Sequence, residues 1–208
     1  MGVLLKPKPP KKTRMTVREY MAIPPDKHWD TLLIYGEMIV MPRPRPKHNR
    51  ANHYLGHMLD RWAVHFDLGM VFFEDDLILS EEDDLAYAPD LMFLAKDHLD
   101  RYREEWVYGP VDLAVEILSP SNRPYLQERK FADYEAYGIP WYWVIDLNPD
   151  QPTLREHQLV DGRYECRSEI AGAEWFEPGL FPGLVFRLPP LLKGDLKAAV
   201  KGKAKKLM

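Results

Sequence analysis

The sequence predicts an α/β fold in which a mixed central β-sheet is flanked by helices. Three observations support this fold class. Residues 48–67 carry apolar side chains at helical spacing, and several short apolar runs of β-type composition precede and follow them. Residues 111–147 then read as strand, helix and strand, the order of a parallel crossover unit.

Composition and length indicate a globular protein with a substantial core. The chain has 208 residues, of which 46% are hydrophobic and 12% aromatic. No run approaches the roughly 18 apolar residues that a membrane span needs, and lysines and prolines at positions 6–10 interrupt any signal peptide. The single cysteine, Cys166, excludes an internal disulfide framework and a cysteine-based zinc site. We therefore expect a soluble cytoplasmic protein with no membrane partner.

Charge is distributed unevenly along the chain, although the net charge is only −4. Residues 1–14 carry five basic side chains and no acid, and residues 193–208 carry six lysines and one acid. The body between them holds 17 of the 28 basic and 31 of the 32 acidic residues, which excludes a broad cationic surface for DNA. We predict a disordered basic tail at 1–14, one domain at 15–192 and a lysine-rich tail at 193–208. Solvated ends are the simpler interpretation of these tails, although their charge can also contact phosphate.

Local patterns predict the first elements of the fold. A capping box at Thr16–Glu19 predicts a short helix. Tyr35-Gly36 divides residues 31–41 into two apolar runs, which predicts a hairpin or a bulged strand. The spacing of apolar residues at 48–67 predicts a long amphipathic helix.

The acidic middle of the chain reads as strands joined by exposed turns. The composition of residues 70–80 predicts a strand that acidic residues interrupt. Residues 74–84 contain seven acidic and no basic side chains. We interpret that acidic cluster as the solvated tip of a hairpin. Residues 87–95 predict a further strand, opened by Pro89-Asp90, and residues 97–109 a loop with a helical turn.

The second half of the chain is predicted to add a crossover unit and a hairpin. The pattern predicts a strand at 111–118, a helix at 122–137 and a strand at 141–147, joined as a right-handed parallel crossover. Asp161-Gly162 separates two β-type runs, which predicts a hairpin. A short apolar strand is expected at 184–188.

Glu116 is the residue that first points to chemistry. It lies inside the apolar run at 111–118, on the opposite strand face from Leu113, Val115 and Ile117. An unpaired buried carboxylate costs several kcal/mol or takes up a proton, so a buried Glu116 needs a partner.

Lys130 is the partner that the helix pattern supplies. Leu126, Lys130, Tyr134 and Tyr137 form one stripe, which should lie on the sheet. The stem of Lys130 can pack there while its ammonium reaches the carboxylate of Glu116. A structural ion pair is the alternative interpretation, but such a pair stabilises little relative to apolar residues, which favours a functional role.

Asp90 adds a second carboxylate to this pair. It follows Pro89 at the start of a strand that we expect beside the strand of Glu116. Two carboxylates and a lysine form the set that a magnesium-dependent phosphodiesterase needs, because Mg²⁺ prefers oxygen ligands and a lysine stabilises charge on phosphate. Taken alone, Asp90 also fits an ordinary turn residue.

Together these residues resemble the Uma-type restriction endonuclease family of the PD-(D/E)XK nuclease superfamily. The resemblance covers roughly residues 15–190 and is carried by Pro89-Asp90, V-E-I-L-S-P-S at 115–121, Lys130, Tyr134, Gly138, Y-W-V-I-D at 142–146, Gly36-Glu37 and His48. It implies a restriction-endonuclease-like fold and a metal-dependent endonuclease that hydrolyses DNA phosphodiester bonds.

The resemblance also implies roles for individual residues. Asp90 and Glu116 would bind Mg²⁺ or Mn²⁺. The lysine of the E-x-K motif falls at Leu118, and Lys130 stands where related families place a lysine that has moved to the next helix. Asp90, Glu116 and Lys130 would therefore be the catalytic set. His48 would contact substrate or metal, or else it simply begins its helix.

Asp146 is a further accessory candidate, because it closes its motif on the strand face that carries Tyr142 and Val144. It is equally typical of a turn. The chain also departs from the family pattern: Leu32 occupies the place of an acid, and Leu126 the place of an aspartate.

These departures and the acidic body leave a second hypothesis open, a non-catalytic nucleic-acid-binding or regulatory protein that retains the nuclease fold. A hydrolase that uses its carboxylate pair on another substrate is a third hypothesis, which gives the lysine no evident purpose. Cleavage of both strands of a duplex usually needs two sites related by a two-fold axis, which is compatible with a homodimer.

Overall fold

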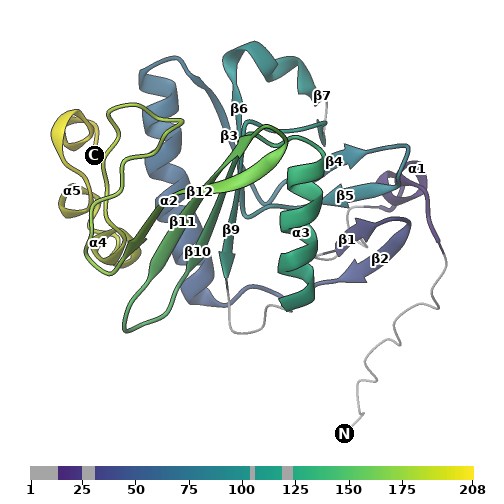
Figure 1. The fold of residues 1–208 in the computed structure, drawn as a ribbon, viewed down its shortest axis with the longest axis horizontal. Helices are drawn as coiled ribbons and strands as arrows, with labels where there is room; N and C mark the ends of the chain where they lie inside the picture. The colour runs from purple at the N-terminus through teal and green to yellow at the C-terminus, as the bar shows by residue number, and fades with distance from the viewer. Residues whose placement is uncertain (1–13, 25–30, 104–105, 119–123) are drawn as a thin grey trace, which may run out of the picture.

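The computed structural model describes residues 14–24, 31–103, 106–118 and 124–208 (Figure 1). Its helices are α1 (Val17–Met21), α2 (Pro46–His65), η1 (Lys96–Arg101), α3 (Pro124–Ala136), α4 (Leu188–Lys193), α5 (Leu196–Ala199) and η2 (Gly202–Lys206). Its strands are β1 (Thr31–Ile34), β2 (Glu37–Val40), β3 (Gly69–Phe73), β4 (Leu77–Ser80), β5 (Leu85–Tyr87), β6 (Leu91–Ala95), β7 (Tyr102–Arg103), β8 (Trp106–Tyr108), β9 (Leu113–Leu118), β10 (Trp141–Asp146), β11 (Thr153–Val160) and β12 (Arg163–Ala171). None of the helices in these ranges is long and apolar enough to cross a membrane. Most of the predicted basic tail lies outside the described residues.

The described strands form two six-stranded mixed sheets rather than one central sheet. The first sheet has the order β2-β1-β5-β4-β8-β7, and the second has the order β12-β11-β10-β9-β6-β3. In the second sheet β9 and β10 are parallel and α3 lies between them in the chain, as the pattern at 111–147 predicts. The predicted α/β class, with mixed sheets flanked by helices, is confirmed.

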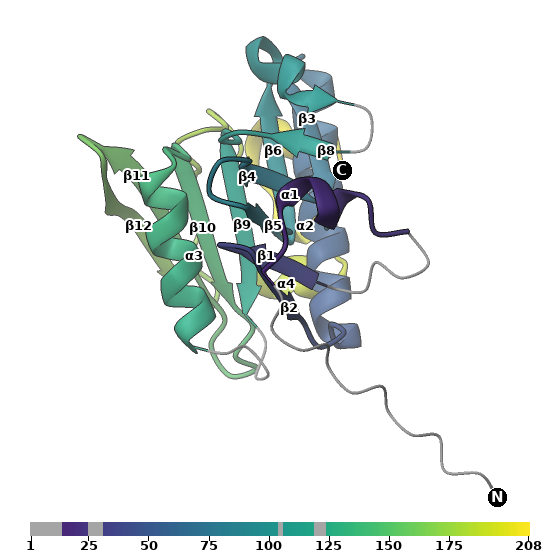
Figure 2. The ribbon, with the colours of Figure 1, turned by 90° about the vertical axis from the view of Figure 1, so that its right-hand side faces the viewer.

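The helices α2 and α3 cover opposite faces of the second sheet (Figures 1 and 2). Alternation along β9 explains this layering. Val115 and Ile117 point into a core shared with α2 and the C-terminal segment, whereas Ala114 packs into a second core with Tyr134 of α3. Glu116 follows Ala114 on the same face and therefore lies beneath α3.

Local sequence determines where the first helices begin. The side chain of Thr16 accepts the N–H of Glu19, whose carboxylate accepts the N–H of Thr16, so the predicted capping box of α1 is formed. Pro46 takes the first position of α2, where its missing N–H costs nothing. The long helix starts two residues before the predicted 48–67, and its apolar stripe is buried as expected: Ala51, Leu55, Met58, Leu59, Trp62 and Ala63.

Both predicted hairpin turns are confirmed by their backbone angles. Tyr35 and Gly36, between β1 and β2, have φ angles of 50° and 78°. Asp161 and Gly162, between β11 and β12, have φ angles of 49° and 78°. Two consecutive positive φ angles are what a type I′ turn requires, and this turn matches the twist of the strands that it joins.

The acidic middle of the chain is arranged differently from the prediction. Residues 87–95 are not one strand, because β5 ends at Tyr87 in the first sheet and β6 begins at Leu91 in the second. Residues 74–76 likewise connect β3 of the second sheet to β4 of the first. Only residues 81–84 form a hairpin tip, between β4 and β5. The acidic cluster is thus divided between a sheet junction and a turn.

Two further expectations are revised. Residues 97–109 hold most of η1 and also the short pair β7 and β8, which extends the first sheet. Residues 184–188 form no regular strand. Phe186 makes isolated bridges to Phe176 and Val200, and α4 begins at Leu188.

The lysine-rich segment at 193–208 packs against the core through its apolar residues. It contains α5 and η2, and all six of its lysines are exposed. Between them Ala199, Val200 and Ala204 are buried against the core that α2 covers. The segment therefore covers the second sheet, whereas its composition alone suggests a solvated tail.

Replacing Val200 by aspartate tests this packing. We expect Val200→Asp to lower the free energy of unfolding by about 2–4 kcal/mol, because it buries an unpaired charge. The matched change Lys203→Asp, at an exposed position three residues on, should alter the same quantity by about 0.5 kcal/mol or less. Denaturant unfolding monitored by circular dichroism measures both. Equal effects of the two changes would contradict the packed arrangement.

Candidate active site

Glu116 is buried between β9 and α3, with only 7% of its surface exposed. The Nζ of Lys130 donates to both of its carboxylate oxygens, each at 2.7 Å. The hydroxyl of Tyr134 donates to Oε1 at 2.9 Å. Lys130 and Tyr134 come from the predicted stripe of α3, one turn apart. The structure therefore brings together the two charges that the sequence places on facing surfaces.

Burial dominates the electrostatics of this pair. It raises the pKa of Glu116, while the ammonium of Lys130 opposes this shift and the charge of Asp90 adds to it. Burial and the charge of Glu116 also raise the pKa of Tyr134 well above its ordinary value, so this phenol remains a hydrogen-bond donor. Lys130 and, to a smaller extent, the hydroxyl of Tyr134 thus favour the ionised form of Glu116 against its burial.

Asp90 lies beside Glu116 because of the register between β6 and β9. Leu91 pairs with Val115 in this antiparallel ladder, so the preceding Asp90 faces the position of Glu116. Its Oδ2 accepts the N–H of Ile117 at 2.6 Å. The two candidate carboxylates are therefore neighbours at the end of the second sheet where β6 begins and β9 ends. We call this end of the strands the carboxylate edge.

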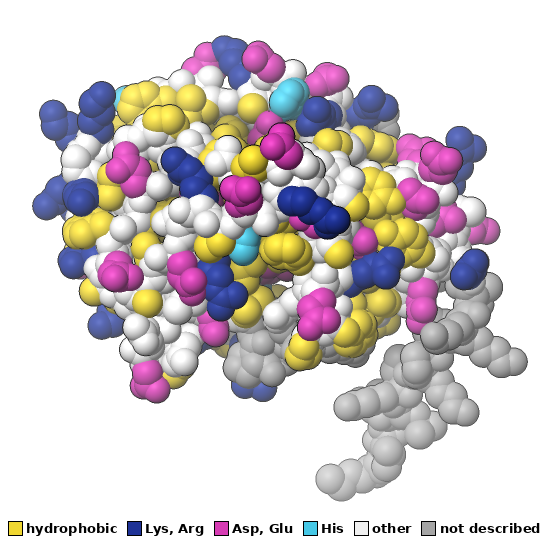
Figure 3. Space-filling view, viewed as in Figure 1, with side chains coloured by type: hydrophobic (Ala, Val, Ile, Leu, Met, Phe, Trp, Pro, Cys, Tyr) yellow, Lys and Arg dark blue, Asp and Glu magenta, His cyan; other side chains and the backbone are white. Residues whose placement is uncertain are grey.

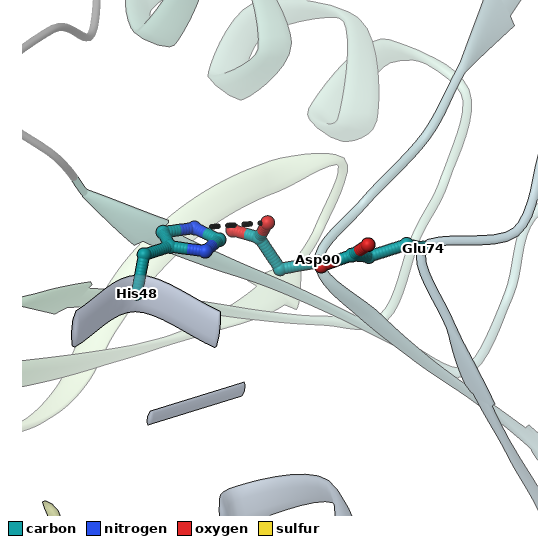
Figure 4. A group of neighbouring side chains, drawn as sticks. All are labelled: His48, Glu74 and Asp90. Atoms are coloured by element: carbon teal, nitrogen blue, oxygen red, sulfur yellow. Dashed lines mark ion pairs between the residues drawn. The ribbon is translucent and has the colours of Figure 1, made fainter. Parts of the chain in front are cut away.

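His48 and Glu74 approach Asp90 from α2 and from the end of β3 (Figure 4). The Nε2 of His48 lies 3.1 Å from Oδ1 of Asp90. Glu74 follows Phe73, which pairs with Leu91, and its N–H donates to the carbonyl of Asp90 at 3.2 Å. One nitrogen or oxygen atom from each of the three side chains lies within 4.8 Å of the others.

The charge state of His48 depends on these neighbours. Burial lowers the pKa of its imidazole, but the hydrogen bond to Asp90 and the charges of Asp90 and Glu74 raise it, and the net shift is upward. This shift favours the protonated imidazole, whose Nε2 then donates to Asp90.

The donors at this edge fit a divalent cation. Asp90, Glu74 and Glu116 offer oxygen atoms, the ligands that Mg²⁺ and Mn²⁺ favour, and His48 offers a nitrogen. Because Asp90 raises the pKa of Glu116, their carboxylates repel each other, and a cation near Asp90 would relieve this repulsion.

Asp133 holds α3 in place and was missed by sequence reasoning. It is buried, and its carboxylate accepts hydrogen bonds from Tyr35, Tyr87 and Arg129 at 2.9, 2.6 and 3.0 Å. These donors come from the β1–β2 turn, from β5 and from α3 itself. The network ties the helix of Lys130 to the first sheet, so Asp133 positions Lys130.

The remaining candidate, Asp146, lies outside this cluster of contacts. Asp146 is exposed at the end of β10 and accepts the N–H of Asn148 at 3.0 Å, which is the turn role considered for it. Glu74 was missed, because in the sequence it reads as one of seven acids in a solvated tip. Only the antiparallel pairing of β3 with β6 reveals its place.

On the face shown in Figure 3, acidic and basic side chains are interspersed, in keeping with a body that lacks a broad cationic surface.

Lys130→Met tests how far the ion pair depends on both partners. We expect it to lower the free energy of unfolding at neutral pH by about 3–5 kcal/mol, because Glu116 is left buried without its counter-charge. The double variant Glu116→Gln/Lys130→Met removes both charges and should be more stable than Lys130→Met alone. Denaturant titrations of the four proteins of this cycle measure the coupling. A double variant less stable than Lys130→Met would contradict the pairing.

Comparison with known proteins gives a family and a fold. The Uma2 family model, described as "Putative restriction endonuclease", matches residues 17–189. A similar solved structure is that of a putative nuclease belonging to DUF820 from Anabaena variabilis ATCC 29413. It is 17% identical, with a TM-score of 0.70 over 88% of this chain and 99% of that chain, a likeness that shows a shared fold. Among curated proteins, no match was found. Because the family model spans most of its length, the chain belongs to the Uma2 family of putative restriction endonucleases.

Proposed function

We propose that the protein is a metal-dependent endonuclease that hydrolyses DNA phosphodiester bonds at a site formed by Asp90, Glu116 and Lys130. The observation that carries this proposal is the buried Glu116–Lys130 pair next to Asp90. These residues lie where β3 and β9 end and β6 begins. Membership of a family of putative restriction endonucleases supports the same reaction class.

The metal would be Mg²⁺ or Mn²⁺, held at the carboxylate edge by Asp90 and Glu116. When bound, the ion would polarise the phosphate and lower the pKa of a water molecule. The charge of Asp90 raises the pKa of Glu116, and a cation between the two carboxylates would offset this repulsion, which supports the placement.

Lys130 has the position and charge for the chemical step. Its ammonium projects from α3 toward the carboxylate edge, where it can orient the attacking water and offset negative charge that develops on phosphate. Two hydrogen bonds to Glu116 fix the place of its ammonium, and Tyr134 in turn donates to Glu116. In this arrangement Tyr134 acts through Glu116 and is a positioning residue.

The proposed substrate is duplex DNA, and a homodimer would supply the two sites needed to cut both strands. The acidic body favours limited contact with the phosphate backbone, so affinity should come from the site and from the basic chain ends.

Cleavage of supercoiled plasmid in Mg²⁺ or Mn²⁺ tests the proposal. We expect nicked and linear products from the wild type, and rates lowered roughly 100-fold or more by Glu116→Gln and by Lys130→Met, since both remove charge that acts on the transition state. Lys96→Met is the matched control. Lys96 forms an exposed ion pair with Asp67, so its loss should leave the rate unchanged.

Two results would contradict the catalytic assignment. One is equal cleavage by the wild type and by folded Glu116→Gln. The other is the absence of cleavage by the wild type in either metal. The second result would favour the alternative function, a non-catalytic nucleic-acid-binding or regulatory protein, to which the acidic body and the exchanged family acids point. Electrophoretic mobility shifts with the same DNA would then detect binding without cleavage.

A further inference from the structure

We infer that a basic strip formed by Arg43, Arg45, Lys47 and Arg50 binds the phosphate backbone of the DNA on one side of the cut. The strip consists of the link from β2 to α2 and the start of α2. The inference rests on the proposed function only in taking DNA as the ligand. It adds to the basic chain ends a contact surface within the folded body, made of residues outside the catalytic set.

The basic strip is an exception to the acidic character of the folded body. Residues 38–59 contain no aspartate or glutamate, and all of their lysine and arginine side chains fall at 43–50. All four of these side chains are exposed. Positive charge is thus concentrated at one place in a body where acidic side chains outnumber basic ones.

None of the four basic side chains pairs with a carboxylate among the described residues. Lys47 donates to the backbone carbonyl of Leu147 at 2.5 Å, and Arg50 to that of Lys193 at 3.4 Å. By contrast, acidic side chains neutralise four arginines elsewhere in the fold: Arg129, Arg155, Arg163 and Arg167. The charges of the basic strip therefore remain to be offset by an anion from outside the fold.

Three prolines hold the first half of the basic strip in an extended form. Pro42, Pro44 and Pro46 alternate with Arg43 and Arg45. A residue that precedes proline is restricted to extended conformations, and Arg45 has φ and ψ angles of −82° and 157°. The segment therefore loses little conformational freedom when it binds a ligand, which favours affinity.

The basic strip lies beside the carboxylate edge. His48 lies between Lys47 and Arg50 in α2, and its Nε2 is 3.1 Å from Oδ1 of Asp90. The hydrogen bond of Lys47 to Leu147 places this lysine at the end of β10, which ends level with β9. In Figure 1 the link from β2 to α2 runs at the same end of the molecule as the end of β9. A DNA strand with one phosphate at the edge therefore has neighbouring phosphates within reach of the strip.

Acidic side chains on the other flanks of the edge determine the direction of the DNA. Asp146 and Asp150 are exposed at and beyond the end of β10, and Glu128 is exposed on α3. Their charges repel phosphate, whereas those of the basic strip attract it. The duplex would therefore run from the edge along the strip, away from α3 and from the turn between β10 and β11.

The competing explanation is that the basic strip only joins the start of α2 to neighbouring segments. It accounts for the hydrogen bonds of Lys47 and Arg50, but it gives the charges of Arg43 and Arg45 no purpose. The two explanations differ in the salt dependence of DNA binding, because each phosphate contact releases condensed counterions from the DNA.

Fluorescence anisotropy of a short labelled DNA duplex, titrated with the full-length protein in EDTA, separates them. We expect the logarithm of the binding constant to fall linearly with the logarithm of NaCl concentration between about 50 and 200 mM. Arg43→Ala/Arg45→Ala should reduce the magnitude of this slope by about 2, because each phosphate contact contributes about 0.9. Arg18→Ala/Arg61→Ala, which removes the same charge at two other exposed arginines, is the matched control and should leave the slope unchanged.

Circular dichroism first confirms that both double variants are folded. Equal slopes for the wild type and Arg43→Ala/Arg45→Ala would overturn the inference, as would equal reductions in the two double variants or the absence of binding by the wild type. Plasmid cleavage is scored separately. A protein that binds DNA through the strip but never cleaves it would support this inference and contradict the proposed nuclease. Cleavage by a protein whose slope does not depend on Arg43 and Arg45 would do the reverse.

Discussion

The buried ion pair between Glu116 and Lys130 is the contact on which the site depends. A carboxylate inside a strand is costly unless a counter-charge reaches it, and here that charge comes from a helix that packs on the sheet. The pair therefore joins α3 to β9 of the second sheet. Tyr134 and Asp133 on the same helix extend this arrangement, one toward the second sheet and the other toward the first.

The second constraint is the register of three neighbouring strands. β3, β6 and β9 are antiparallel neighbours, so the end of the first, the start of the second and the end of the third lie at one edge. Asp90 and Glu116, distant in sequence, become neighbours there. Basic side chains reach these two carboxylates from opposite faces of the sheet, Lys130 from α3 and His48 from α2. A phosphate that reaches the edge would meet a cationic side chain above the sheet and the proposed metal at its rim.

Much of this arrangement follows from local sequence. Period-two alternation in β9 identifies the face of Glu116, and helical spacing identifies Lys130 as its partner. Positive φ angles at Asp161 and Gly162 follow from residue types that tolerate them. The division of the strands into two sheets does not follow, because short strands such as β5 and β6 choose partners through distant contacts. Glu74 shows the same limit: its role depends on which residue of β6 faces the end of β3, which composition does not encode.

The C-terminal segment shows a related limit of composition. Its lysines suggest a solvated tail, yet Ala199 and Val200 are buried against the core. Lysine side chains can lie on the outer surface of a segment that packs against the core. The few small apolar residues between them then determine whether the segment packs. Counting charges alone therefore misjudges where the folded body ends.

The position of Glu74 at the junction between the sheets has a mechanical consequence. The chain between Glu74 and Asp90 contains β4 and β5, a hairpin that belongs to the first sheet while both of its flanks belong to the second. The hydrogen bond from the N–H of Glu74 to the carbonyl of Asp90 closes this segment into a loop and restricts how far the hairpin can separate from the second sheet. Loss of this contact would therefore release the hairpin before the rest of the fold opens.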